Sequence, residues 1–380
     1  MTRENNFCIK PKISYGENSL NSLKNFGFTR VCIATDKFMV ESKLINKVTD
    51  ILDNHNIDYH IFDEITPDPS TEIIQKGLSH IINLKPHALI AVGGGSVIDA
   101  AKAITYFCLQ LKKNFIEENQ IVKPYFIAIP TTAGTGSEVT NFSVITDLES
   151  NTKIPLTNDI MLPDEAILDP ILTVSVPSSV TAATAMDVLT HGIESYISNN
   201  SNIFSQMYAL ESIKLVSSNL LKCYNNLDNL EYRNNLQIAS CMAGIAFNSS
   251  GLGITHSIAH AIGSSFHLPH GLCNALILPY IIEFNNKDKN TSSKYVKILE
   301  CMGLNNINQN EASIILKSLI KELNKSLNIP LNLSSLNINK EQFKALVPIL
   351  AQTALKDICT KTNPADVTIF DLEKLINNLY

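Results

Sequence analysis

Residues 88–107 read ALIAVGGGSVIDAAKAITYF, and they set the architecture of the first half of the chain. The apolar run 88–92 is typical of a strand buried on both faces, three glycines then predict a tight turn, and helical spacing begins at Val97. Similar strand patterns at 31–35, 57–62 and 125–129 alternate with helical patterns. The sequence therefore predicts an α/β fold with βαβ units, a parallel sheet and helices on both of its faces.

The pattern changes near residue 178. From Ser178 to Tyr380 almost every periodic stretch has helical spacing, with a polar loop at 326–341. The clearest helical stretches are 204–223, 231–247, 311–324, 340–355 and 369–379. Two domains are expected, an α/β domain over residues 1–177 and an all-helical domain over residues 178–380.

Bulk composition excludes several classes of protein. With 380 residues, 45% hydrophobic and 17% charged, the chain resembles an ordinary soluble globular protein. A net charge of −6 without a Lys/Arg-rich run disfavours a nucleic-acid partner. The N-terminus lacks the apolar core of a secretory signal, and no stretch reaches the roughly 18 apolar residues of a membrane span. Eight cysteines without a CxxC pair indicate reduced thiols, so we expect a cytoplasmic protein with no membrane partner.

Two loops rich in glycine and hydroxyl residues follow successive predicted strands. The first contains Gly94, Gly95 and Ser96 at the start of a helix, where free N–H groups favour a phosphate. Its spacing is not GxGxxG, and such a turn alone more often has no ligand. The second loop, 130–139, follows the next strand. Because ligands of open α/β sheets bind at the carboxyl ends of the strands, the two loops together favour a nucleotide site.

Asp36 directly follows the first apolar strand. A carboxylate at such a position can accept hydrogen bonds from a ribose 2′-OH and repel a 2′-phosphate. It can equally serve as the N-cap of the helix that follows. The two roles are compatible if they use different oxygens.

Four of the nine histidines lie in the stretch 251–279. His256 and His260 are four residues apart and would share one helical face. Pro269 interrupts the helical pattern, so a helix, a turn and a new helix would bring His256 and His270 to one point. The fourth histidine of this stretch, His267, lies in the turn, and its role stays open.

A second helical pattern carries Asp187 and His191 with the same spacing of four residues. Three imidazoles and one carboxylate are a suitable shell for a divalent transition metal, which leaves His260 as a nearby proton carrier. The alternative is that these histidines are hydrogen-bonded core residues, that Asp187 caps a helix and that His191 pairs with Glu194. The concentration of histidines favours the metal site.

Together these motifs resemble the iron-containing (group III) alcohol dehydrogenases. The resemblance runs from KPKISYG near the start to CTKTNPADVTIFDLE near the end, and PDPS, DKFMV and AILDP are most similar to the propanol, butanol and ethanol dehydrogenase branch. The motifs that carry it are GGGSVIDAAKAI, PTTAGTGSEVTNFSVITD, MDVLTHGIESYIS, GLGITHSIAHAIG and HLPHGLCNALILPY.

The resemblance implies a Rossmann-like NAD-binding domain over residues 1–177 and an all-α metal-binding domain over residues 178–380, the dehydroquinate synthase-like architecture, with a cleft between the domains. It places His260 beside the nicotinamide as the catalytic histidine and implies a homodimer or higher homo-oligomer. The implied ligands of Fe²⁺, or alternatively Zn²⁺, are Asp187, His191, His256 and His270. The implied contacts with NAD are Asp36, Asp68, Gly94, Gly95, Ser96, Thr131, Thr132, Thr140, Phe142, Lys153 and Leu168.

The expected reaction is reversible NAD(H)-linked hydride transfer between a small primary alcohol and its aldehyde, with short-chain substrates such as propanol and propanal. Within the same family, reductases of lactaldehyde, of a hydroxyaldehyde or of a phosphonate aldehyde are alternatives. A dehydroquinate-synthase-like lyase shares the two-domain plan but would recycle its NAD. A third class, a metal- or nucleotide-binding scaffold without catalysis, finds no support in the motifs.

Overall fold

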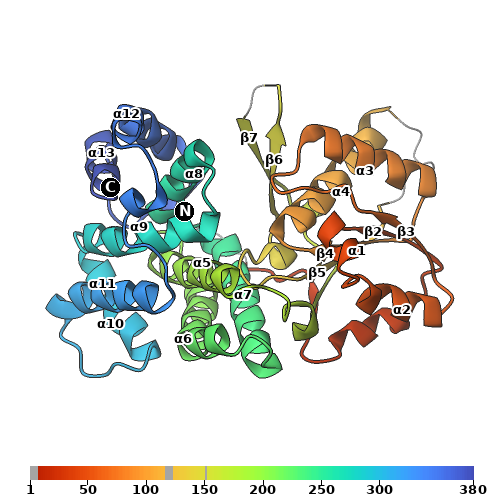
Figure 1. The fold of residues 1–380 in the computed structure, drawn as a ribbon, viewed down its shortest axis with the longest axis horizontal. Helices are drawn as coiled ribbons and strands as arrows, with labels where there is room; N and C mark the ends of the chain where they lie inside the picture. The colour runs from red at the N-terminus through yellow and green to blue at the C-terminus, as the bar shows by residue number, and fades with distance from the viewer. Residues whose placement is uncertain (1–6, 116–122, 150–151) are drawn as a thin grey trace, which may run out of the picture. The chain divides into compact units, whose positions relative to one another are not determined.

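Strand β4 (Ala88–Gly93) is buried along its whole length in the centre of a six-stranded parallel sheet (Figure 1). This computed structural model describes residues 7–115, 123–149 and 152–380. The chain divides into two units, Met1–Ser175, which contains the sheet, and Val176–Tyr380.

All neighbouring strands of this sheet pair in parallel, in the order β1-β8-β5-β4-β2-β3. The predicted parallel sheet is therefore confirmed. Two of its strands, β1 and β8, have only four residues each and were not expected from the sequence. The remaining bounds are β1 Lys12–Tyr15, β2 Arg30–Ala34, β3 Asp58–Phe62, β5 Tyr125–Pro130 and β8 Glu165–Leu168.

Helices cover both faces of the sheet, which explains why β4 is apolar at every position. Leu89 and Ala91 belong to the same core as side chains of α3 and α4, whereas Ile90 and Val92 pack with side chains of α2 and the 3-10 helix η1 on the other face. The helices of this unit are α1 Lys37–Glu41, α2 Asn46–Asn54, α3 Thr71–Leu84 and α4 Gly95–Phe115, with η1 at Ser19–Asn25.

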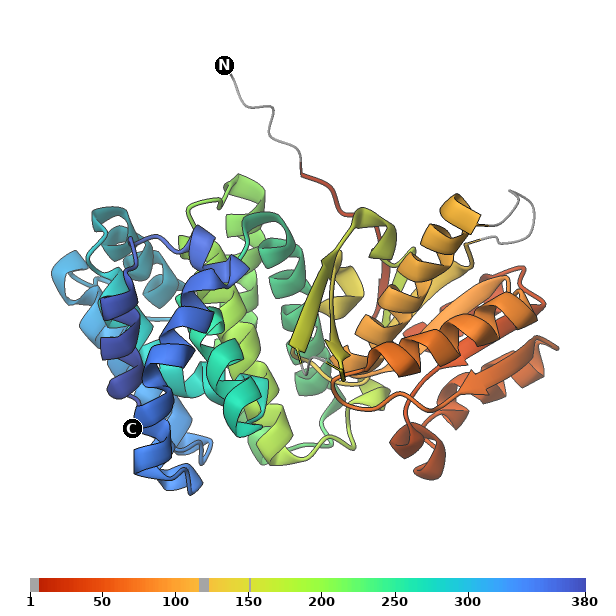
Figure 2. The same cartoon turned by 90° about the horizontal axis from the view of Figure 1, so that it is seen from above.

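The order of the strands creates a topological switch point between β2 and β4. From β2 the chain moves outward to β3 and then returns to form β4 on the opposite side of β2. In open α/β sheets, ligands bind at the carboxyl edge beside such a point. A separate antiparallel hairpin follows β5. Its strands, β6 (Phe142–Asp147) and β7 (Thr152–Thr157), lie side by side in Figure 2.

Residues 176–380, all of which the structure describes, contain helices and no strand. Helix α5 is buried around most of its circumference and packs against α6, α7 and α9, while α8 packs against α9 and α12 (Figure 1). The all-helical character of this part is therefore confirmed. Its helices are α5 Ser178–Ile197, α6 Ile203–Asn225, α7 Leu230–Ser250, α8 Ile254–Phe266, α9 His270–Asn285, α10 Lys289–Cys301, α11 Gln309–Ser326, α12 Lys340–Lys356 and α13 Ile369–Asn377.

Within the described part of the chain, no single helix is both long and apolar enough to cross a membrane. The bent pair α7 and α8 reaches the required length and composition only when the two helices are taken together across a 106° bend.

Candidate metal centre and cofactor site

Three helices bring four potential metal ligands to one point in the unit Val176–Tyr380. Asp187 and His191 come from α5, His256 comes from α8, and His270 is the first residue of α9. One ligand atom from each residue lies within 4.8 Å of the others. The Oδ1 atom of Asp187 faces the Nε2 atoms of His191 at 4.0 Å, of His256 at 3.7 Å and of His270 at 3.5 Å.

The turn between α8 and α9 has the geometry that Pro269 suggested. Helix α8 ends at Phe266, His267 follows in the left-handed region with φ 52°, and Pro269 is the N-cap of α9. His267 is exposed at this helix end and is not one of the four clustered residues. The predicted succession of helix, turn and helix is therefore confirmed. His256 lies on the first helix, and His270 is the first residue of the second.

Gly271 allows the first turn of α9 to lie directly on α5. A Cβ atom added at Gly271 would lie 2.2 Å from the carbonyl oxygen of Ala183 and 3.3 Å from the Cβ of Asp187. No side chain fits in that space, because real Cβ contacts are never this short. The distance between His270 and Asp187 is therefore set by contact between two helix backbones.

Asn274, one turn after His270, shows that the four candidate ligands can hold a group with partial positive charge, because its amide NH₂ lies among them. Its Nδ2 group contacts Oδ1 of Asp187 at 2.6 Å, Nε2 of His256 at 3.0 Å and Nε2 of His270 at 3.1 Å, while its Oδ1 is buried without a partner among the described residues. Three lone pairs thus converge on the positive end of one amide. A carboxylate oxygen and imidazole nitrogens are ligands that Fe²⁺ and Zn²⁺ both accept, so the residues fit a divalent transition metal.

Burial and neighbouring charges give these groups different protonation. Burial disfavours ionisation of Asp187, but the neighbouring His191, His270 and His256 act in the opposite direction and hold the pKa of its carboxyl well below the usual range. Burial lowers the pKa of His191 to about 4, so its ring is neutral and keeps a lone pair. Burial also acts against His256, but hydrogen bonds to Asp187 and Glu194 raise its pKa to about 9.

Glu194 is the partner of His256. Its Oε2 atom lies 2.6 Å from Nδ1 of His256, whereas Nδ1 of His191 is buried without a hydrogen-bond partner among the described residues. The alternative in which His191 pairs with Glu194 is therefore wrong. Glu194 lies one turn beyond His191 on α5 and so reaches the start of α8.

His260 lies beside the four ligands and is only partly buried. Its ring stacks on His270 with centroids 5.2 Å apart, and its Nδ1 lies 2.8 Å from Oδ2 of Asp357. Burial acts against the charge on Asp357, but the hydrogen bond from His260 outweighs it and lowers the pKa of the carboxyl to about 2. Asp357 therefore holds a proton on Nδ1 and leaves Nε2 of His260 for another group.

The sheet of the other unit gathers the expected cofactor residues at one edge. Asp36 follows β2, Gly94 follows β4, Thr131 follows β5 and Leu168 ends β8. Because β8, β5, β4 and β2 are adjacent and parallel, these four positions share the carboxyl edge beside the switch point. The two loops meet there, since a Cβ added at Gly95 would lie 2.6 Å from Cγ2 of Thr135.

Asp36 has the helix-capping role that was one of its two interpretations. Its Oδ1 atom accepts a hydrogen bond of 3.0 Å from the backbone N–H of Met39 at the start of α1. The cap uses one carboxylate oxygen, so the role toward a ribose remains compatible with it. Asp68 and Lys153, two further expected contacts, form an ion pair with each other.

A buried lysine, which was not predicted from the sequence, organises the second loop. Lys102 on α4 donates hydrogen bonds to Oγ of Ser137 at 2.7 Å, to Oγ1 of Thr140 at 2.9 Å and to the carbonyl of Phe142 at 2.8 Å. Burial lowers its pKa to about 8 although Asp99 and Glu138 oppose this. Asp99 in turn accepts from Ser137 Oγ at 2.6 Å and from the N–H of Val144 at 3.1 Å. Thr140 and Phe142, both expected to touch NAD, are thus held through Lys102.

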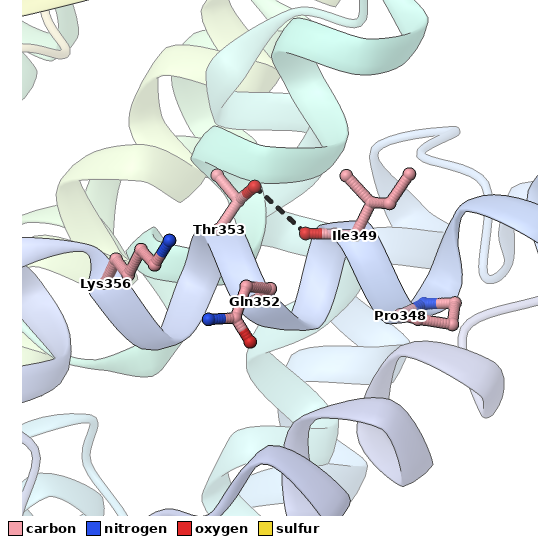
Figure 3. Close-up of a pocket in the computed structure, with 5 residues that line it drawn as sticks. All are labelled: Pro348, Ile349, Gln352, Thr353 and Lys356. Carbon is pink, nitrogen blue, oxygen red and sulfur yellow. Dashed lines mark hydrogen bonds between the residues drawn. The ribbon is translucent and has the colours of Figure 1, made fainter.

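A hollow on α12 contains none of these residues, although its Lys356 directly precedes Asp357. Figure 3 shows that its lining comes from one helix, with the hydroxyl of Thr353 bonded to the carbonyl of Ile349. The lining residues are Pro348, Ile349, Gln352, Thr353 and Lys356. Their only charged group is one amine and they form no cluster of metal ligands, so this hollow is a weaker candidate for a functional site than the four clustered residues.

Comparisons with known proteins agree along the whole chain. Residues 11–170 match the family described as iron-containing alcohol dehydrogenase, and residues 181–380 match the C-terminal part of the Fe-containing alcohol dehydrogenase family. The chain is 39% identical to a 1-propanol dehydrogenase of Citrobacter freundii, covering 98% of this chain and 99% of that protein. It is 37% identical to an NADPH-dependent butanol dehydrogenase of Clostridium saccharobutylicum, covering 98% and 97%. A crystal structure of a 1,3-propanediol oxidoreductase superposes with a TM-score of 0.90 at 28% identity and covers all of both chains.

Proposed function

The chain belongs to the iron-containing alcohol dehydrogenase family, and from this we propose that it interconverts a short-chain primary alcohol and its aldehyde with NAD(H). Propanol and propanal are the substrates we favour, because two similar proteins are named for 1-propanol and butanol. The observation that carries the proposal is the convergence of Asp187, His191, His256 and His270 on one point.

The four ligands define what the chain contributes to catalysis. The chemistry that a divalent ion supplies when bound is Lewis acidity toward the oxygen of the alcohol or aldehyde. Asp187 adds one negative charge to the shell and the histidines add none, so part of the positive charge is left for the substrate oxygen. Asn274 orients toward the same centre and holds Asp187. We infer that Fe²⁺ is the natural ion, with Zn²⁺ as the alternative.

His260 is the residue that we propose for proton movement. With Asp357 on its Nδ1, its Nε2 can accept the hydroxyl proton of an alcohol and return it to the oxygen of a reduced aldehyde. The side chain of His260 is 38% exposed, which gives the proton a route to water. Hydride chemistry itself belongs to the nicotinamide.

The unit Met1–Ser175 supplies the features that we propose for NAD. The N-terminus of α4 after Gly94 offers N–H groups to a pyrophosphate, and the loop around Thr131 and Thr132 faces it. Asp36 would accept from the adenosine ribose and disfavour a 2′-phosphate. We also propose a homodimer in the cytoplasm, which follows from the family resemblance and the composition.

Metal removal tests the proposal most directly. Protein purified without oxygen and then treated with a chelator is expected to lose NADH oxidation with propanal, because the substrate oxygen loses its Lewis acid. Refilling with Fe²⁺ is expected to restore the rate, and refilling with Zn²⁺ in a parallel sample compares the two ions. Full activity of protein shown to be metal-free would contradict the metal mechanism.

Stoichiometry separates a dehydrogenase from a lyase. One NADH is expected to be consumed for each propanal reduced, whereas a lyase of similar architecture would return its NAD to the starting state. Rates across an aldehyde panel, including lactaldehyde, 3-hydroxypropanal and a phosphonate aldehyde, would then identify the substrate class. Propanal and butanal are expected to give the highest kcat/KM.

Lys102→Met is expected to raise KM for NADH by about tenfold with a smaller change in kcat, because three acceptors lose their donor and the loop around Thr140 loosens. A tenfold change corresponds to about 1.4 kcal/mol, which is within the penalty for leaving a buried acceptor unpaired. The matched control is Lys76→Met, which removes an exposed ion pair with Glu64 and should leave KM unchanged. Equal KM values in both variants and the parent would exclude the role given to Lys102.

A further inference from the structure

We propose that Glu194 is a positioning residue for the metal centre, because it fixes the tautomer and the orientation of His256. This rests on the proposed function, in which His256 is a metal ligand. Glu194 does not belong to the ligand set, and its carboxylate points to the opposite side of the imidazole ring from Asp187.

The side chain of Glu194 is buried, and both of its carboxylate oxygens accept hydrogen bonds. Its side chain and that of His256 are each 1% exposed. Oε2 accepts from Nδ1 of His256 at 2.6 Å and from the backbone N–H of Gly253 at 2.9 Å, and Oε1 accepts from the N–H of Thr255 at 2.7 Å. Three donors surround one carboxylate, and because backbone N–H groups can only donate, both of its oxygens are acceptors.

An ionised carboxylate can only accept hydrogen bonds, so Nδ1 of His256 must carry a proton. When the ring gives up its other proton, as a metal-binding histidine must, its lone pair is on Nε2, which lies 3.7 Å from Oδ1 of Asp187. Carboxylate–histidine pairs of this kind orient metal ligands and increase their basicity.

The influence of Glu194 extends to a second ligand. His191 has no partner for its buried Nδ1 among the described residues, and its ring is held between His256 and Phe247 with centroid distances of 4.6 Å to each. A fixed orientation of His256 therefore also restricts the orientation of the His191 ring that stacks on it.

Glu194 also determines where α8 begins. Its oxygens take two of the free N–H groups at the N-terminus of that helix, and a Cβ added at Gly253 would lie 2.8 Å from Oε1. Asp187, His191 and Glu194 occupy one face of α5 at spacings of four and three residues. Thus α5 supplies two ligands and the carboxylate that orients a third.

Glu194→Gln tests this role with almost no change in shape. The amide has one acceptor oxygen, so its NH₂ group must face either the N–H of Thr255 or the side shared by Gly253 and His256. In the second case His256 moves its proton to Nε2 and cannot bind a metal. We expect the affinity for Zn²⁺, measured on metal-free full-length protein by competition with a chromophoric chelator, to fall by 10- to 100-fold, about the usual loss for such partners.

The matched control is Asn363→Ala. The Oδ1 atom of Asn363 accepts from the N–H of Ile254 at 3.3 Å, so this variant disturbs the same helix end without touching His256. Its Zn²⁺ affinity is expected to stay within about threefold of the parent, below the loss typical of an orienting partner. An equal loss in both variants would show that the effect comes from the helix end and would overturn the inference.

The tautomer gives a readout that a purely structural role does not change. Nitrogen-15 spectra of protein with labelled histidine, assigned with a His256→Gln variant, are expected to show a protonated Nδ1 and a Zn²⁺-bound Nε2 for His256, and to lose this pattern in Glu194→Gln. If the parent protein binds no Zn²⁺, the proposed function fails. If the parent binds Zn²⁺ and Glu194→Gln binds it equally well with the same spectrum, only the role of Glu194 fails.

Discussion

Asp187→Ala and His270→Ala are each expected to lower kcat for propanal reduction by about a thousandfold or more. Lewis-acid stabilisation by a bound metal amounts to several kcal/mol, and each 1.36 kcal/mol changes the rate about tenfold. Asp187 is the ligand whose loss has the larger effect, since its Oδ1 atom faces all three histidines and carries the only negative charge of the shell.

The measurement needs both the metal content and the rate of NADH oxidation for each variant. His267→Asn is the control, because it changes a histidine of the same stretch at an exposed position with φ 52°, a conformation that asparagine adopts readily. This control should keep the metal and the rate of the parent. Turnover at the parent's rate in either alanine variant would contradict the assignment of the four ligands.

Asp36→Ser is expected to shift the ratio of kcat/KM for NADPH over NADH upward by about 10- to 100-fold. A carboxylate close to a 2′-phosphate repels it by about 3 kcal/mol at an effective dielectric constant of 20, and solvent reduces this. In the parent protein Oδ1 of Asp36 caps α1. Serine can cap the same helix with its hydroxyl oxygen, so the substitution removes only the charge.

The shift should weaken as salt is added, because screening reduces the repulsion that the parent exerts. The thermal unfolding midpoint serves as a control for the helix cap and should stay close to that of the parent. Equal efficiency of NADPH and NADH in the parent protein would contradict the selective role of Asp36, whatever the variant does.

Local patterns in the sequence predict the sheet and the clustering of the four candidate ligands. The proximity of His256 and His270 could be predicted from the sequence, because a helical pattern and the helix-breaking Pro269 lie within a few residues of each other. The apolar run 88–92 predicted a strand because both of its faces are buried. The strands β1 and β8, four residues each, could not be found this way, because they are too short to show a period.

The groups that surround the ligands depend on contacts between distant residues. Glu194 meets His256 from 62 positions away, and Asp357 meets His260 from 97 positions away. A carboxylate on a helix has no local feature that distinguishes such a partner from a surface charge. Lys102 could have been noticed, since a lysine about two turns into a helix that follows a buried strand has little access to water, but its acceptors follow only from the fold.

Gly271 has a consequence for redesign of the centre. Ion selectivity is usually altered by exchanging ligand side chains, but here the spacing of the proposed ligands also depends on the closeness of two main chains, Ala183 on α5 and Gly271 on α9. A residue as small as alanine at position 271 would push the helices apart and enlarge the opening without changing any donor atom. The spacing of the four proposed ligands thus depends on the absence of a methyl group at position 271, and a library at this single position would test larger ions with the same four residues.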